Sequence, residues 1–191
     1  MAKESRVNSA SEEQENSKLL ILWYAIAAIV VALDLFTKML ASNSLALYER
    51  INVMAMFDIT LRHNYGAAFS FLAGAGGWQV WFFGLLAGAV SLVLIVWIAK
   101  IGTRKSLEVL GLALILGGAV GNLYDRVTLG YVVDFILVYY NDAYQFPAFN
   151  VADSAITAGA GILILDAIKK SIHEHRQKNQ PSSKSTDSLP H

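Results

Sequence analysis

Residues 117–153 read GGAVGNLYDRVTLGYVVDFILVYYNDAYQFPAFNVAD and lie between two apolar runs that are long enough to cross a membrane. Among the acids of this stretch are Asp125, Asp134 and Asp153, and two of them close Asn-x-x-Asp units at 122–125 and 150–153. Carboxylates at membrane depth are costly and usually serve a function. The stretch therefore predicts a site built from acids at the edge of a bilayer.

Four apolar runs flank or precede this stretch, and they predict an α-helical polytopic membrane protein. The chain of 191 residues is 55% apolar and 16% charged, whereas a soluble domain is nearer to about 25% charged. A helix of about 20 apolar residues spans the hydrocarbon core. We expect transmembrane helices at about 19–40, 78–99, 107–124 and 151–168.

One membrane domain at 19–170 accounts for these runs, and two polar segments flank it. Residues 1–18 and 171–191 have few apolar side chains, so neither can bury enough surface to offset the entropy of ordering. We expect both to be disordered. In the outer loop at 41–77, apolar and polar residues alternate over 57–62, which predicts a strand with one wet face.

The basic residues predict the orientation of the four spans. With four spans, the two termini and the loop at 100–106 share one side of the membrane. That side holds eleven basic residues, Lys3, Arg6, Lys18, Lys100, Arg104, Lys105, Lys169, Lys170, Arg176, Lys178 and Lys184. The other side holds four, Lys38, Arg50, Arg62 and Arg126. The positive-inside rule then predicts cytoplasmic termini, with Asp34, Asp125, Asp134 and Asp153 gathered at the outer face.

Other chemistries lack the residues they need. The chain has no cysteine, and its four histidines are scattered, so we expect no metal site and no cofactor. The net charge is zero, which argues against a nucleic-acid partner.

Two of the outer acids have nearby partners that favour a structural role. Asp34 precedes Lys38 by four residues, the spacing of an ion pair on one helix face. Asp125 shares a predicted helix face with Asn122 and Arg126, which indicates a hydrogen-bonded cluster that holds the helix end.

Asp134 and Asp153 are the stronger candidates for chemistry. Asp134 has no basic residue within seven positions. Asp153 falls in the first turn of a predicted helix with Asn150 as its N-cap, so a dipole-stabilising role and a catalytic role fit it equally well. Two carboxylates that share one proton can activate water and protonate a leaving amine, as in aspartic proteases.

Two other classes of membrane protein remain alternatives at this point. A transporter or proton channel also places acids at membrane depth, although usually near the middle of a span, and here the interiors of the spans lack charge. A structural membrane protein explains the small residues Ala113, Gly117 and Gly121 as a packing stripe, but not acids gathered on one face.

Five motifs resemble those of the bacterial lipoprotein signal peptidase (signal peptidase II) family, which consists of polytopic inner-membrane aspartic peptidases. In chain order they are DLFTK at 34–38, RHNYGAAF at 62–69, GGAVGNLYDR at 117–126, VVDF at 132–135 and FNVADSAI at 149–156. The resemblance covers about residues 19–170.

This resemblance implies an activity, a substrate and a set of site residues. The family removes the signal peptide from diacylglyceryl-modified prolipoproteins, cutting just before the lipid-modified cysteine, with membrane lipids around it and globomycin-type cyclic peptides as inhibitors. Its catalytic acids match Asp134 and Asp153. Its supporting positions match Asp34, Lys38, Asn64, Gly66, Asn122, Asp125, Arg126 and Asn150. The resemblance also implies a small extramembrane β-sheet (the β-cradle) and a short flap-like periplasmic helix, which we expect within 43–63 and 136–148.

Overall fold

Four long helices form the body of the protein in the computed structural model, which describes residues 2–66, 76–103, 106–140 and 144–178. They are α1 (Ala2–Ser44), α2 (Trp78–Ile101), α3 (Leu107–Thr128) and α4 (Val151–Lys178). Each is long and apolar enough to cross a membrane. The predicted four-span architecture is therefore confirmed.

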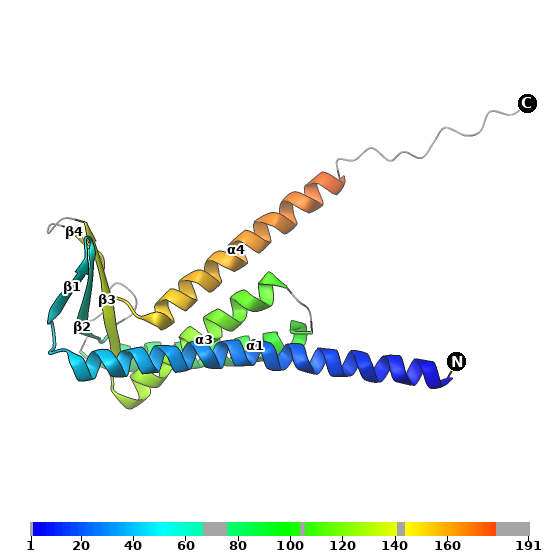
Figure 1. The fold of residues 1–191 in the computed structure, drawn as a ribbon, viewed down its shortest axis with the longest axis horizontal. Coiled ribbons are helices and arrows are strands. Elements are labelled where there is room, and N and C mark those ends of the chain that lie inside the picture. The colour runs from blue at the N-terminus through cyan, green and yellow to red at the C-terminus, as the bar shows by residue number, and fades with distance from the viewer. Residues whose placement is uncertain (1, 67–75, 104–105, 141–143, 179–191) are drawn as a thin grey trace, which may run out of the picture.

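A small antiparallel sheet lies at one end of the helices, and the first residues of α1 and the last residues of α4 lie toward the opposite end (Figure 1). Its strands are β1 (Arg50–Met54), β2 (Phe57–Asn64), β3 (Val132–Tyr140) and β4 (Tyr144–Gln145). They pair in the order β1-β2-β3-β4. This confirms the predicted extramembrane sheet and brings the segment after α1 beside the segment after α3.

The strand predicted at 57–62 is present as β2, but its polar face is buried rather than wet. Asp58 is 3% exposed and Thr60 is fully buried. Neighbouring residues explain the difference, because Arg50 and Asn52 from β1 donate hydrogen bonds to the Asp58 carboxylate. The Thr60 hydroxyl donates to the Glu49 carbonyl. Buried polar groups are tolerated when they are hydrogen-bonded in this way.

The short flap-like helix expected within 136–148 is not found in the described part of that segment. Residues 136–140 complete β3 and residues 144–145 form β4, while 141–143 lie outside the described residues. The run FILVYY is β-branched and aromatic, a composition that favours a strand. Ile136 and Leu137 pair with Ile59 and Asp58 of β2, and this pairing satisfies the backbone of the segment.

The first and last helices extend beyond the predicted spans. Residues 2–18, expected to be disordered, continue α1 as helix, and residues 171–178 continue α4. Neither segment contains Gly or Pro, and a helix that is already nucleated propagates at low cost through residues of this kind. The remainder of the predicted tail, 179–191, lies outside the described residues.

Glycines let α3 and α4 pack backbone to backbone. A Cβ atom added at Gly111 would lie 2.9 Å from the Gly159 carbonyl oxygen, and one added at Gly159 would lie 2.6 Å from the Gly111 carbonyl oxygen. Nearer the sheet, Gly118 faces the Ala152 carbonyl with no room for a Cβ. Small residues give this close approach between membrane helices, and here it fixes where the first turn of α4 begins.

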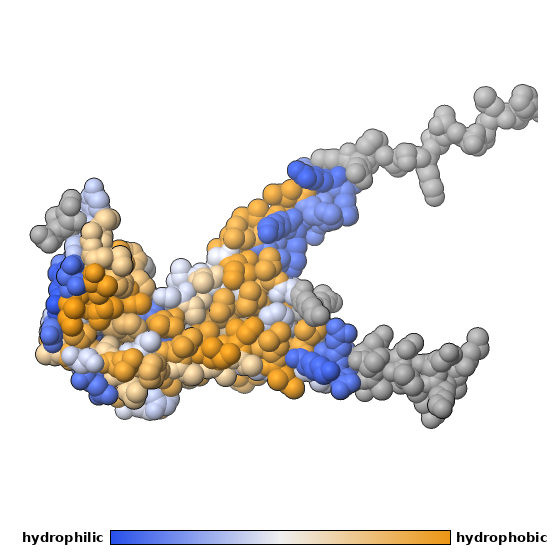
Figure 2. Space-filling view, in the orientation of Figure 1, coloured by the Kyte–Doolittle hydropathy of each residue, from blue (hydrophilic) through white to orange (hydrophobic). Residues whose placement is uncertain are grey.

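The outer surface of the helices is apolar, as expected of a protein surrounded by lipid. Figure 2 shows hydrophobic residues along the middle of the helices and hydrophilic residues at their ends far from the sheet. Large apolar side chains such as Leu85 (77% exposed) and Trp81 (72% exposed) face outward. An exposed apolar surface of this extent marks contact with a membrane or a partner.

Candidate active site

Asp134 lies in β3, where the sheet meets the helices. Its side chain is 3% exposed, and its backbone position pairs with Arg62 of β2. One carboxylate oxygen accepts a hydrogen bond from the Asn64 amide at 3.0 Å. The other accepts from the Asn150 amide at 2.8 Å. The strand thus presents a buried acid whose two oxygens both accept from neutral donors.

Asp153 occupies the first turn of α4, as the sequence predicts. Its backbone N–H donates to the Asn150 side-chain oxygen at 2.9 Å, so the predicted N-cap is confirmed. The Asn150 backbone N–H points back to the Asp153 carboxylate at 3.4 Å. This reciprocal arrangement is a capping box, and the positive end of the helix dipole favours negative charge on Asp153.

Two asparagine amides connect the two acids. The Asn150 amide donates to Asp134 and to the Asn122 side-chain oxygen, the latter at 3.2 Å. The Asn122 amide in turn donates to Asp153 at 2.8 Å. A continuous chain of hydrogen bonds therefore runs from Asp134 through Asn150 and Asn122 to Asp153.

The environment of Asp134 favours its protonated form. Burial, followed by the nearby negative charge of Asp153, raises the pKa of Asp134 to about 7. The amides of Asn64 and Asn150 oppose this shift because they stabilise the carboxylate. A shared proton is the expected consequence when two acids are held close together in a low dielectric.

A separate cluster of charges lies beside the two acids, and we call it the lysine cluster: Asp34, Lys38 and Asp125. The Lys38 ammonium is 3% exposed. It lies 2.6 Å from an Asp34 oxygen and 2.9 Å from an Asp125 oxygen. It also donates to the Asn122 side-chain oxygen at 3.0 Å. The ion pair predicted between Asp34 and Lys38 is confirmed.

Asp125 has the structural role that the sequence favours, but with a different partner. The sequence places it beside Arg126, whereas its carboxylate pairs with Lys38 of α1 and accepts from the Val133 backbone N–H at 3.1 Å. Arg126 instead donates to the carbonyl oxygens of Asn122 and Gly66. Residues 125 and 126 point in different directions around the helix, and only the packing of α1 reveals which partner each one meets.

Gly66 and Arg126 orient Asn64 toward Asp134. The Gly66 backbone N–H donates to the Asn64 side-chain oxygen at 2.9 Å, and the Arg126 guanidinium holds the Gly66 carbonyl at 3.0 Å. With its oxygen occupied, the Asn64 amide directs its NH₂ group to Asp134. All eight supporting positions expected from the sequence therefore lie in one connected network around the two acids.

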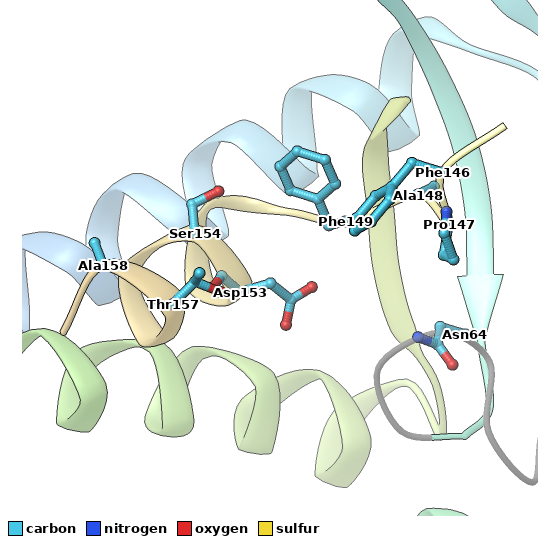
Figure 3. A pocket seen from close by; sticks show the side chains of 9 residues that line it. All are labelled: Asn64, Phe146, Pro147, Ala148, Phe149, Asp153, Ser154, Thr157 and Ala158. Carbon is cyan, nitrogen blue, oxygen red and sulfur yellow. The ribbon is translucent and has the colours of Figure 1, made fainter. Parts of the chain in front are cut away.

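A cavity of about 500 Å³ opens beside Asp153. Figure 3 shows the Asp153 carboxylate and the Asn64 amide facing the same space, with Phe146 and Phe149 on its far side. Most of the remaining lining is apolar, from residues 146–149 and from α4. The cavity offers an extended apolar segment a place beside both acids. In the described parts of the chain, no three His, Asp or Glu side chains gather into a metal site.

Comparison with known proteins identifies the family. The family model described as signal peptidase (SPase) II matches residues 26–169, which is well over half of the chain. The chain belongs to the signal peptidase II family.

Relatives and solved structures agree with this assignment. The lipoprotein signal peptidase of Teredinibacter turnerae is 55% identical over 146 residues, which cover 76% of this chain and 86% of that protein. That of Pseudomonas putida is 51% identical over 150 residues, covering 78% and 88%. A bacterial membrane enzyme solved by the in meso method at 2.3 Å superposes with a TM-score of 0.70 at 28% identity, covering 88% of this chain and 94% of that one.

Two contacts between different elements of this signal peptidase have no signal in the sequence. The Ala152 backbone N–H, in the first turn of α4, donates to the Asp34 carboxylate of α1 at 2.8 Å. The Val133 N–H, in β3, donates to Asp125 of α3. The Asp34 and Asp125 carboxylates thus hold the segments that carry Asp153 and Asp134. The residues are separated by 118 positions in one case, so local spacing could not have found the pairing.

Proposed function

We propose that Asp134 and Asp153 are the catalytic dyad of this signal peptidase, which removes signal peptides from prolipoproteins. The observation that carries the proposal is the environment of the two acids. They are joined through Asn150 and Asn122, and the pKa of Asp134 is raised to about 7. In the described parts of the chain neither acid forms an ion pair, so one proton remains available between them.

In the first step, the ionised Asp153 takes a proton from a water molecule, and the oxygen of that water attacks the scissile carbonyl carbon. Asp134 donates its proton to the carbonyl oxygen, which gives a neutral tetrahedral diol. The hydrogen bonds from Asn122 and from the start of α4 stabilise negative charge on Asp153 before the attack. The two acids thus act as base and acid at one carbonyl group.

In the second step, the diol collapses and the carbon–nitrogen bond breaks. Asp153 gives its proton to the departing amine, and a diol hydroxyl returns a proton to Asp134 as the new carboxylic acid forms. Asp134 is again protonated and Asp153 is again ionised, so the dyad is regenerated with one water consumed. This sequence follows the aspartic-protease pattern of one proton on two acids.

The substrate we propose is a diacylglyceryl-modified prolipoprotein, cut just before its lipid-modified cysteine. The peptide strand next to the scissile bond occupies the cavity between α4 and residues 146–149, which is apolar except near Asn64 and the polar residues Asp153, Ser154 and Thr157 of α4. Globomycin-type cyclic peptides inhibit by filling the same cavity and contacting the dyad. The substrate and the cyclic peptides are both large, mainly apolar molecules with a peptide backbone, which suits this lining.

We also propose the bacterial inner membrane as the location, with the termini in the cytoplasm and the dyad at the periplasmic face. The basic residues gather at the termini and in the 100–106 loop, which supports cytoplasmic termini. The sheet lies at the other end of the helices (Figure 1). The dyad then lies at the outer membrane–water boundary, level with the scissile bond, and water can reach the bond there.

Replacement of each acid by asparagine tests the dyad. Asp134→Asn and Asp153→Asn keep the shape of the side chain but remove proton exchange, so each should lower kcat by about 10²- to 10⁴-fold. The assay is release of signal peptide from a diacylglyceryl-modified precursor by the purified protein in detergent. Wild-type turnover in either variant would overturn the proposal.

Asp166→Asn is the matched control. Asp166 pairs with Lys170 near the other end of α4, so this variant should cleave at the wild-type rate. All three variants should unfold at temperatures close to that of the wild type, which separates a loss of chemistry from a loss of fold.

A further inference from the structure

A second groove also reaches Asp153, next to the cavity of Figure 3, and we call it the helix groove. Three helices line it, each with one face. From α2 come Phe83, Ala87 and Val90, and from α3 come Ile115, Ala119 and Arg126. These residues recur every three or four positions, which places them in one stripe along each helix. The groove has a volume of about 310 Å³.

The helix groove is polar at one end and, apart from Thr157, apolar along the rest of its length. Asp153, Asn122 and Arg126 lie at the end nearest the sheet. Further along α3 the stripe continues with Ala119 and Ile115, which have no polar side-chain atoms. A molecule that fits this gradient has a polar group beside the dyad and a hydrocarbon portion directed into the membrane.

The length of the helix groove matches one leaflet of a bilayer. Arg126 and Ile115 are eleven residues apart on α3, which corresponds to about 16 Å at 1.5 Å per residue. Half of the hydrocarbon core is about 15 Å. Beyond this point the bundle is closed by packed side chains, including Ile98 (fully buried) and Leu112 (1% exposed). A signal-peptide helix that crosses the whole core needs twice this length, whereas an acyl chain ends at the midplane.

We propose that the helix groove holds one acyl chain of the diacylglyceryl group on the substrate cysteine, and that Ala87 and Ala119 determine how much chain it accepts. This proposal rests on the proposed function, because Asp153 lines both the groove and the cavity assigned to the peptide. The scissile bond then lies beside Asp153, which lines both, with the peptide in the cavity and the lipid in the groove.

Ala87 and Ala119 are the residues to test because their small side chains leave the groove open. Ala119 is 7% exposed and faces α2 from α3, and Ala87 faces it from α2. A leucine at either position adds three carbon atoms to the space that the chain would occupy. One methylene too many in a hydrophobic pocket lowers kcat/KM by about 10- to 200-fold.

The experiment compares two precursors that have the same peptide and differ only in the acyl chains of their diacylglyceryl group, sixteen or eight carbons long. For Ala87→Leu and Ala119→Leu we expect kcat/KM on the long-chain precursor to fall about tenfold relative to the short-chain precursor. Ala89→Leu is the matched control. It makes the same substitution on the same helix at an exposed position, and it should leave both rates within about twofold of the wild type.

Two outcomes of this comparison would overturn the proposal. The first is an equal loss of kcat/KM on both precursors, which would mean that the groove holds the peptide. The second is an unchanged kcat/KM on both precursors. Failure of the proposed function itself looks different, because the wild-type protein would then cleave neither precursor.

Crosslinking of the wild-type protein keeps the proposal testable if the leucine variants do not fold. The probe is a long-chain precursor with a photoreactive diazirine at the end of its acyl chains. Label on Val90 or Ile115 is expected, since these residues line the far part of the groove. Label confined to residues 146–149 of the other cavity would overturn the assignment.

Discussion

Two groups of carboxylates lie side by side in this protein, and their partners differ in kind. In the lysine cluster, the acids Asp34 and Asp125 both contact the buried Lys38 ammonium. In the dyad, Asp134 and Asp153 accept hydrogen bonds from amides. A cation in contact compensates the charge of a buried acid, whereas neutral donors leave that charge uncompensated. This difference matches the division between the supporting acids and the dyad that we propose.

Asn122 connects the two groups and lets one orient the other. Its side-chain oxygen accepts from Lys38 at 3.0 Å, so its NH₂ group must face the other way, toward Asp153. The cation therefore orients a donor of the proposed dyad and forms no ion pair with either of its acids in the described residues. The predictions below test this division between a structural group and a catalytic group.

The largest expected effect is the loss of the Lys38 charge. Lys38→Met leaves two buried carboxylates without compensation, which should cost about 3–5 kcal/mol of the free energy of unfolding. Thermal or chemical unfolding of the purified protein in detergent measures this. Lys169→Met, at an exposed position of α4, is the control and should change little. Equal stability of the two variants would mean that the lysine cluster does not hold the fold.

The next effect concerns the contact that sets the position of the dyad. Gly118→Ala places a methyl group against the Ala152 backbone, which should cost about 1–3 kcal/mol of stability and lower kcat, because Asp153 follows Ala152. Gly161→Ala is the control, since nothing lies within 4 Å of the added atom. If Gly118→Ala keeps both wild-type stability and kcat, the α3–α4 contact does not position the first turn of α4.

The pH dependence of activity tests the protonated state of Asp134 without any mutation. The pKa of Asp134 is raised to about 7, and Asp134 must be protonated to act as the acid. As pH rises above about 7 the proton is lost, so kcat/KM should fall about tenfold per pH unit. The profile belongs to the pair of acids rather than to one of them. A flat profile up to pH 9 would contradict a protonated Asp134.

The smallest effect is expected at the end of the bundle far from the dyad. Lys170 pairs with Glu108 and Asp166, but its side chain is 56% exposed. Exposed ion pairs contribute about 0–1 kcal/mol, so Lys170→Gln should change the unfolding temperature only slightly and leave cleavage unchanged. A loss comparable to that of Lys38→Met would show that exposure does not distinguish the two lysines.

The sequence predicted the elements of the protein better than their ends. Apolar runs predicted the four spans because a membrane helix needs about 20 consecutive apolar residues, which can be read directly from the sequence. The same reasoning missed the continuation of α1 over residues 2–18 and of α4 over residues 171–178, because polar residues without Gly or Pro fit a helix as well as a coil. It also missed the buried polar face of β2, since the partners of Asp58 come from another strand.

By itself the sequence favoured Asp134 for chemistry, because Asp34 and Asp125 have charged neighbours along the chain and Asp134 does not. It left Asp153 open between a dipole-stabilising and a catalytic role, and only the family resemblance favoured the catalytic one. Only the tertiary structure decided how they are grouped. Lys38 on α1 reaches Asp125 on α3, and Asn64 and Asn150 meet at Asp134. Local spacing reports contacts within one helix turn, whereas the proton affinity of a buried acid depends on every group that packs around it, and packing brings those groups from distant parts of the chain.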